Sequence, residues 1–190
     1  MIPEALVLSF IVALIRGGSV SRLAATPLRR TWLIIAPGLL LILLYLAKPL
    51  GVPHAAVAAR HFQLVAYAFI LAALCWNLRL PGIAFVASGT GLNFLVTLLN
   101  RGDMPVSLPA ARAAGMHELA RMLVSNKDLV RHVLMSDHTR LNFLADIIPA
   151  PRPPFPFPGV MSVGDIMASI GLFVFVQYAM VGGRSRRVES

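Results

Sequence analysis

Five long apolar runs, at residues 2–15, 32–47, 62–76, 82–99 and 160–181, constrain this chain more than any other feature. A helix needs about 20 apolar residues to cross a bilayer core of about 30 Å, and the first run is shorter than that. It is therefore either a short spanning helix or an interfacial one. The pattern predicts an all-α fold: a polytopic transmembrane bundle of about five hydrophobic segments, forming a single membrane domain over residues 1–190.

Charge is scarce in this chain, and its placement indicates a membrane. Only 13% of the 190 residues are charged and 57% are hydrophobic, whereas a soluble domain carries about a quarter charged residues. The net charge of +9 comes largely from arginines between the apolar runs, where they set orientation and contact anionic head groups. Basic and aromatic residues are not interleaved, so we expect no nucleic-acid partner.

The arginines also predict an orientation in a bacterial cytoplasmic membrane. Basic residues follow the first, third and fifth runs, which places these connections and the C-terminus in the cytoplasm. The residues concerned are Arg16, Arg22, Arg29, Arg30, Arg79, Arg184, Arg186 and Arg187. The long stretch 100–160 then lies outside.

Within residues 100–160 the sequence predicts short surface helices and a stiff connection. Ser107 followed by Leu108 and Pro109 is typical of a helix start. Ser125 and Asp128 form a weak capping-box signal for a second helix. Six prolines at positions 149–158 favour an extended segment.

Polar residues at membrane depth follow two of the predicted helices. Helical spacing places one set on one face of run 82–99 and the other on one face of run 160–181. The first set is Gly89, Asn93, Thr97 and Asn100, and the second is Ser162, Asp165, Ser169, Phe173 and Gln177. We expect the two helices to face each other, or a wet cavity, through these stripes.

Asp165 and Asp146 are the candidate catalytic residues. A carboxylate in hydrocarbon costs about 3 kcal/mol on insertion scales, so Asp165 needs a partner, a proton or a polar cavity. The proline-rich stretch can turn the chain back and bring Asp146 to the start of the last helix. Two nearby carboxylates can then share a proton and act as acid and base. The alternative is ion pairing with arginine, for which Arg101, Arg140 and Arg152 are available.

Neither a cofactor nor a metal site is predicted. His117 and Glu118 do not continue as a zinc-protease motif, because position 121 is arginine. The remaining histidines have no metal-ligand spacing.

Two resemblances add to these observations. The motif NRGDMPV at residues 100–106, with LADIIP at 144–149 and SVGD at 162–165, resembles an uncharacterised family of bacterial integral membrane proteins known only as a domain of unknown function. The same motifs are similar, more distantly, to those of lipoprotein signal peptidase, an aspartyl peptidase of bacterial membranes. That second resemblance implies Asp146 and Asp165 as the catalytic pair and Asn100, Gly102 and Arg140 as substrate-binding residues.

Three functions remain open from the sequence. The first is an aspartyl membrane hydrolase acting at the outer face on a membrane-anchored peptide or a lipid-linked substrate. The second is a non-catalytic membrane subunit or assembly factor that has a partner membrane protein and whose polar stripes are helix-packing contacts. The third is a small carrier in which Asp165 binds a proton or cation. Each of them has membrane lipids as its surroundings.

Overall fold

The computed structural model describes residues 2–47, 55–125 and 132–182. Its helices are α1 (Ile2–Ile15), α2 (Val20–Ala24), α3 (Trp32–Ala47), α4 (Ala55–Trp76), α5 (Ile83–Leu99), α6 (Leu108–Ala113), α7 (His117–Val124) and α8 (Val163–Val181). A short 3-10 helix, η1, covers Asn142–Leu144, and the strands are β1 (Met104–Val106), β2 (His132–Leu134), β3 (Ile148–Ala150) and β4 (Gly159–Met161). Each of the five apolar runs is mainly helical, and residues 160–161 at the start of the last run belong to β4.

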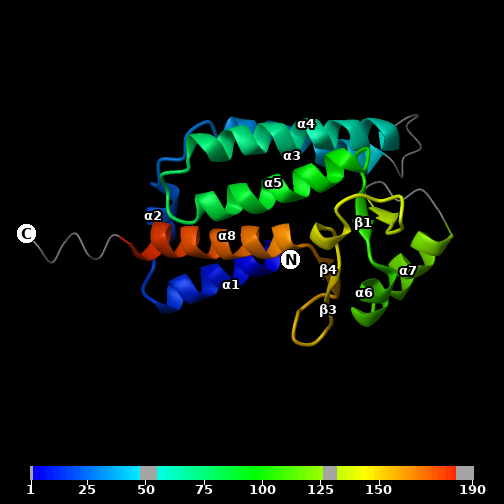
Figure 1. The fold of residues 1–190 in the computed structure, drawn as a ribbon. Coiled ribbons are helices and arrows are strands. Elements are labelled where there is room, and N and C mark those ends of the chain that lie inside the picture. The colour runs from blue at the N-terminus through cyan, green and yellow to red at the C-terminus, as the bar shows by residue number, and fades with distance from the viewer. Residues whose placement is uncertain (1, 48–54, 126–131, 183–190) are drawn as a thin grey trace, which may run out of the picture.

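The longer helices form a bundle, with a smaller module at one end (Figure 1). α8 packs against α5 on one side and α1 on the other, while α4 packs against α3 and α5. The small module comprises α6, α7 and the strands, and it lies where α5 ends and α8 begins (Figure 1). The bundle and this module meet at the candidate site.

The predicted five-span polytopic bundle is wrong. In the part of the chain that the structure describes, α8 is the one helix long and apolar enough to cross a membrane, judged by length and composition. Helices α1, α3 and α5 have 14, 16 and 17 residues, and a rise of about 1.5 Å per residue leaves each short of a bilayer core. The apolar composition of these runs therefore predicted helices correctly, but it was not enough to predict that each helix spans a membrane. One such helix is compatible with membrane association.

The prediction of an all-α fold is also wrong, because residues 100–161 contain two small sheets. β1 pairs with β2 in parallel, with Met104 opposite His132. β3 pairs with β4 in antiparallel fashion, with Ile148 opposite Met161. Each strand has three residues, which is too short for the alternation that reveals a strand in sequence.

Two local predictions within residues 100–160 are confirmed. Ser107 caps α6, and its Oγ accepts a hydrogen bond from Ala110 N at 3.3 Å. The proline-rich segment connects β3 to β4 and turns the chain back as expected, but residues 152–157 form turns and bends instead of the extended segment predicted. The weak helix signal at Ser125 extends to Asp128, which lies outside the described residues, as do Arg184, Arg186 and Arg187.

The predicted contact between the two polar stripes is confirmed at the start of α8. Glycines allow α5 and α8 to approach closely: a Cβ atom on Gly164 would clash with the Asn93 side chain and with Gly89 O. Hydrogen bonds between Asn93, Ser162 and Asp165 then join the helices.

The far end of the α8 stripe contacts α1 instead of α5. Gln177 Nε2 donates to Ser9 O at 2.8 Å, and Arg16 Nη1 donates to Gln177 Oε1 at 2.8 Å. Twelve positions separate Asp165 from Gln177, and at 3.6 residues per turn they rotate the side chain by about 120°. The steps of three and four therefore drift around the helix, and α8 uses its polar residues to contact two neighbours.

Candidate functional site

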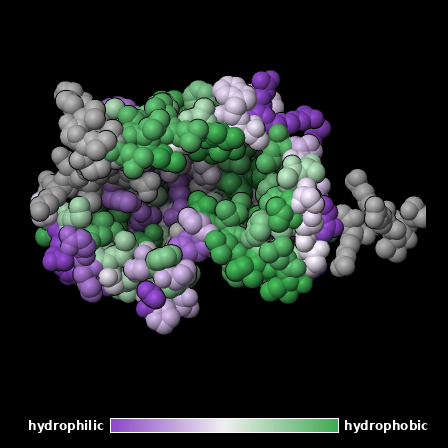
Figure 2. Space-filling model, turned by 180° about the vertical axis from the view of Figure 1, so that it is seen from behind, coloured by the Kyte–Doolittle hydropathy of each residue, from purple (hydrophilic) through white to green (hydrophobic). Residues whose placement is uncertain are grey.

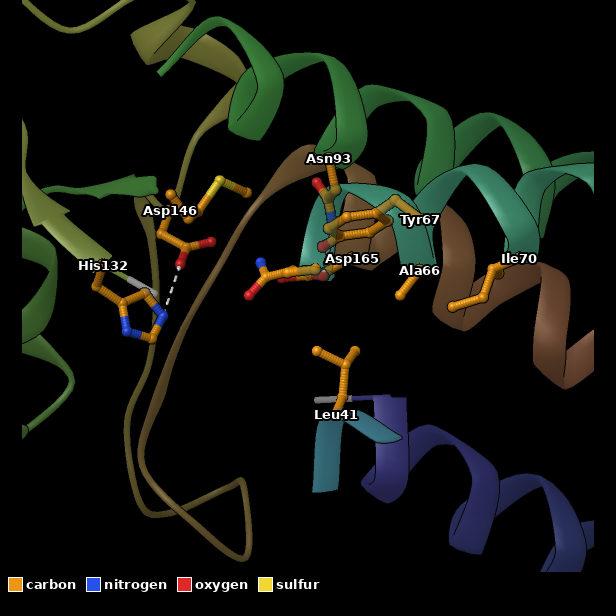
Figure 3. Close-up of a pocket in the computed structure, with 10 residues that line it drawn as sticks. Leu41, Ala66, Tyr67, Ile70, Asn93, His132, Asp146 and Asp165 are labelled. Carbon is orange, nitrogen blue, oxygen red and sulfur yellow. Dashed lines mark hydrogen bonds and ion pairs between the residues drawn. The ribbon is translucent and has the colours of Figure 1, made fainter. Parts of the chain in front are cut away.

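A cavity of about 270 Å³ lies where the bundle meets the small module (Figure 3). Its lining comes from four helices, two strands and the segment before β3. The residues are Leu41, Gln63, Ala66, Tyr67, Ile70, Asn93, Met104, His132, Asp146 and Asp165. Seen from behind, hydrophilic residues are visible in a hollow between apolar surfaces (Figure 2). The polar groups therefore lie inside an otherwise apolar flank.

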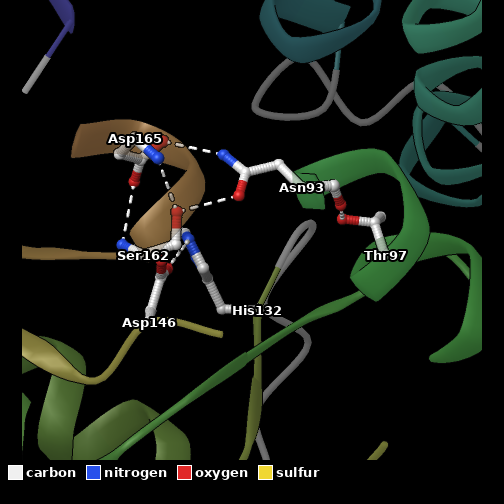
Figure 4. A network of polar contacts seen from close by, with 6 residues as sticks. All are labelled: Asn93, Thr97, His132, Asp146, Ser162 and Asp165. Atoms are coloured by element: carbon white, nitrogen blue, oxygen red, sulfur yellow. Dashed lines mark hydrogen bonds and ion pairs between the residues drawn. The ribbon is translucent and has the colours of Figure 1, made fainter. Parts of the chain in front are cut away.

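Asp165 is held at the first turn of α8 by a capping box. Its backbone N donates to Ser162 Oγ at 2.9 Å, and its Oδ2 accepts from Ser162 N at 3.2 Å. Its Oδ1 accepts from Asn93 Nδ2 at 2.9 Å, and Ser162 Oγ donates to Asn93 Oδ1 at 2.8 Å (Figure 4). Both oxygens of Asp165 accept N–H groups. Each oxygen keeps lone-pair capacity for a further donor.

Asp146 is placed by the backbone of the small module. Its N donates to Pro105 O at 3.1 Å, and its O accepts from Ser107 N at 2.9 Å. These bonds attach residue 146 alongside β1. The side chain is 11% exposed, and its Oδ2 lies 3.9 Å from His132 Nε2 (Figure 4). A histidine and a carboxylate therefore face the cavity as a pair.

The structure brings Asp146 and Asp165 to one cavity, although 19 positions separate them in the chain. The β3–β4 hairpin does this, because its register aligns Ile148 with Met161 and so places residues 146 and 165 beyond the same end of the hairpin. Within the described residues, the hydrogen bonds of the Asp165 carboxylate run to Asn93 and Ser162, and none runs to Asp146.

The arginines proposed as alternative partners do not pair with either acid. In the described ranges, no ion pair joins Arg101, Arg140 or Arg152 to Asp146 or Asp165. The half-buried position of Asp165 is instead explained by its helix cap and by the amide of Asn93.

Three polar residues of the cavity were missed from the sequence: Gln63, Tyr67 and His132. Gln63 and Tyr67 lie on α4, one helical turn apart, and helical spacing could have paired them. His132 carries no sequence signal, because it reaches Asp146 through the pairing of β2 with β1 across a long connection. Across the cavity Leu41, Ala66 and Ile70 supply an apolar wall (Figure 3).

The residues predicted to bind substrate lie elsewhere. Asn100 and Arg140 line a second cavity, of about 620 Å³. Gly102 is buried in the turn after α5, with φ of 97° and its N donating to Thr97 O at 2.8 Å. Met104 and His132 line the first cavity while their neighbours Asp103 and Val133 line the second. Strand β2 therefore contributes to both cavities, because Val133 and Leu134 line the second cavity while His132 lines the first.

The described part of the chain contains no group of three or more histidine, cysteine, aspartate or glutamate residues that could hold a metal ion. In the first cavity, His132 with Asp146 supplies two such side chains and Asp165 is engaged by Ser162 and Asn93.

Fold and site together define a mostly helical protein in which, among the described residues, α8 is the one helix both long and apolar enough to span a membrane, with an acidic cavity beside the β1–β2 sheet. The chain belongs to a family of unknown function, DUF5317, whose model matches residues 25–177. This range includes every residue that lines the first cavity. An uncharacterized protein of Thermotoga maritima is 34% identical over 101 residues. The match covers 53% of each chain, so it spans about half the length of that relative. No solved structure matches this chain, and neither match carries the name of an activity.

Proposed function

We propose that this protein is a membrane-associated hydrolase that uses Asp146 and Asp165 as an acid–base pair. The observation that supports the proposal is that both carboxylates, carried by segments on either side of the β3–β4 hairpin, line one small cavity. A cavity with convergent polar groups and an apolar wall is the usual form of a small-molecule or catalytic site.

The proposed reaction is the hydrolysis of an amide or ester bond. Asp165 accepts a proton from water, and the water oxygen forms a bond to the carbonyl carbon. The bond from that carbon to the leaving nitrogen or oxygen breaks, and the leaving atom takes a proton from Asp146. Positioned acids and bases of this kind contribute about 10² to 10⁴ in rate. His132, 3.9 Å from Asp146, is suited to returning that proton to the carboxylate.

The cavity lining favours a substrate that is polar at one end and apolar at the other. Asp146, Asp165 and Asn93 lie at the polar side, and Leu41 with Ile70 lies at the apolar side. Outside the cavity, α1 and α3 expose large apolar side chains, including Leu8 at 58% and Leu39 at 58%. An amphiphile or a membrane-anchored peptide fits both features.

The test uses the purified full chain in mixed micelles. The probe is a peptide with one apolar helix and a short polar segment, labelled with a fluorophore and a quencher on either side of the polar segment. We expect cleavage by the unmodified protein, and a loss of at least about 100-fold in rate for Asp146→Asn and for Asp165→Asn. Asp137→Asn removes one exposed carboxylate outside the cavity and should leave the rate unchanged.

Ser162→Ala separates chemistry from folding. It removes the hydroxyl that caps α8 but keeps the Asp165 carboxylate, and loss of such a cap costs about 1 kcal/mol. An acid–base role requires Ser162→Ala to stay active while Asp165→Asn is inactive at equal melting temperature. Equal rates for the unmodified protein and both Asp→Asn variants would exclude the hydrolase.

A second candidate function is supported by the bonding of Asp165 itself. Its two oxygens join α8 to Asn93 on α5, as expected of a non-catalytic subunit whose polar residues fix helix packing. In that case Ser162→Ala and Asp165→Asn lower the melting temperature together, and the probe peptide is not cleaved.

A further inference from the structure

The second cavity carries an inference of its own, independent of the proposed hydrolysis. It has a volume of about 620 Å³ and shares strand β2 with the cavity that holds Asp146. Its basic residues are Arg101, directly after α5, and Arg140, in the turn that precedes η1. His138 from the same turn also lines it.

Both guanidinium groups are available to a ligand. Arg101 and Arg140 are exposed, and neither forms an ion pair or a side-chain hydrogen bond within the described ranges. Asp103 is the acidic residue among the lining side chains. The lining thus holds two fixed positive charges and one negative charge.

The backbone that carries Arg140 is fixed by Asn100. Asn100 Nδ2 donates to Arg140 O at 2.9 Å, and Asn100 Oδ1 accepts from Arg140 N at 2.9 Å. The same amide nitrogen donates to Val96 O at 2.8 Å, which ties the pair to α5. Thr139 Oγ1 donates to Ser136 O at 2.7 Å and closes the turn before Arg140. A turn held in this way presents its arginine without needing to be ordered by the ligand.

Backbone strain is concentrated at this cavity. Arg101 has φ of 60° and Leu141, next to Arg140, has φ of 55°. In the described chain, one other non-glycine residue, Arg30, has a positive φ. Such conformations are unfavourable for residues with a Cβ atom, and they persist where surrounding structure or function requires them. Here the positive-φ residues Arg101 and Leu141 lie in the two segments that carry the arginines of the second cavity.

We propose that this cavity binds a phosphate group through Arg101 and Arg140. The planar guanidinium donates two parallel hydrogen bonds to phosphate oxygens, which makes arginine the usual residue for such recognition. The phosphate has two chemical sources, a phospholipid head group and a free phosphate or small phosphoester, and the shared group is the ligand that the cavity selects.

The experiment measures binding to the purified full chain in micelles of an uncharged detergent. Isothermal titration calorimetry is run with dihexanoyl phosphatidic acid and, separately, with inorganic phosphate. We expect the phosphatidic acid to bind, and Arg101→Gln and Arg140→Gln each to weaken binding by about tenfold, because each removes a charge-assisted contact. Arg140→Lys keeps the charge but lacks the fork, so it should fall between Arg140→Gln and the unmodified protein.

Arg112→Gln is the matched control. Arg112 is exposed on α6 in the same module and lies outside this cavity. Its substitution changes the net charge by the same amount as each cavity variant. If the arginines bind by direct contact and not by long-range attraction, Arg112→Gln should leave the affinity within about twofold of that of the unmodified protein. If inorganic phosphate competes with the phosphatidic acid at similar affinity, the phosphate group alone is the ligand. If it does not compete, the lipid is the source. Unchanged binding in both cavity variants, or an equal loss of affinity in Arg112→Gln, overturns the proposal. The side chains of Arg101 and Arg140 are exposed, so we expect both cavity variants to fold.

Discussion

At the residue scale, the side chain that joins the two main features of the molecule is Asn93. It is 7% exposed, donates to Asp165 Oδ1 at 2.9 Å and accepts from Ser162 Oγ at 2.8 Å. Its amide therefore completes the α8 cap, links α5 to α8 and orients a carboxylate towards the cavity (Figure 4). A single buried amide serves packing and site geometry at once.

Replacing Asn93 by leucine should lower the free energy of unfolding by about 3 kcal/mol. The change removes a hydrogen bond to a charged group and leaves Ser162 Oγ buried without its acceptor, each worth about 1–3 kcal/mol. Thr97→Val is the control, because the Thr97 hydroxyl donates only to Asn93 O within its own helix, at 2.7 Å. Thermal or denaturant unfolding of both variants in the same detergent gives the comparison. A similar loss in the two variants would mean that the amide has no special role.

The candidate site could be predicted from the sequence only in part, and the reason is visible residue by residue. Asp146 and Asp165 stand out because acids are rare in apolar surroundings, and the prolines between them indicate a reversal of the chain. His132 could not be found, since its approach to Asp146 depends on a parallel pairing of three-residue strands. The placement of Arg140 in a different cavity from both acids is likewise a tertiary result.

At the element scale, the α5–α8 contact depends on the absence of side chains at chosen positions. A Cβ atom on Gly171 would lie 2.5 Å from Gly82 O and 2.6 Å from Val86 N. These are backbone atoms, which cannot move aside as a flexible side chain can. Close helix approach through small residues is the packing mode that membrane-associated helices favour.

Gly171→Ala should therefore lower the free energy of unfolding by about 1–3 kcal/mol, the usual cost of overpacking. Gly91→Ala, on α5, is the matched control: its Cβ atom would meet only Leu71 Cδ2, at 3.9 Å. There the substitution should be neutral or stabilise by up to about 1 kcal/mol, because alanine is the better helix residue. Unfolding midpoints of the two variants test the contrast. An equal change in the unfolding midpoint of the two variants would show that α5 and α8 can move apart without loss of stability.

Helices were predictable from the sequence where a long apolar run or a helix cap specified them. The five apolar runs are mainly helical, and Ser107 caps the start of α6, because long apolar runs and helix caps are local signals. The number of spans was not predictable from apolar character, since a helix must also be long enough. The three-residue strands escaped because their stability comes from partners distant in the chain.

At the scale of the whole molecule, the distribution of apolar side chains is uneven. α1 exposes Val7 at 58% and Ile15 at 80%, and α3 exposes Ile42 at 55% and Leu43 at 62%. Hydrophilic residues gather at both ends of the molecule, and the flanks of the long helices between these ends are largely apolar (Figure 2). Contiguous exposed apolar surface on a protein marks a membrane or a protein interface.

We predict that the full chain associates with membranes through these flanks. After cell disruption it should sediment with the membrane fraction, remain there in alkaline carbonate and be released by an uncharged detergent, because burial of apolar area, about 25 cal/mol per Å², drives the association. A paired substitution, Leu39→Gln with Leu43→Gln, should move a measurable share into the supernatant, since both side chains are exposed on α3. The control pair, Arg112→Gln with Arg121→Gln, changes exposed side chains on α6 and α7 and should leave the sedimentation unaltered. A monodisperse protein in the supernatant without detergent would mean that another copy or another protein covers these flanks, and the search for a substrate would then turn from lipids to that partner.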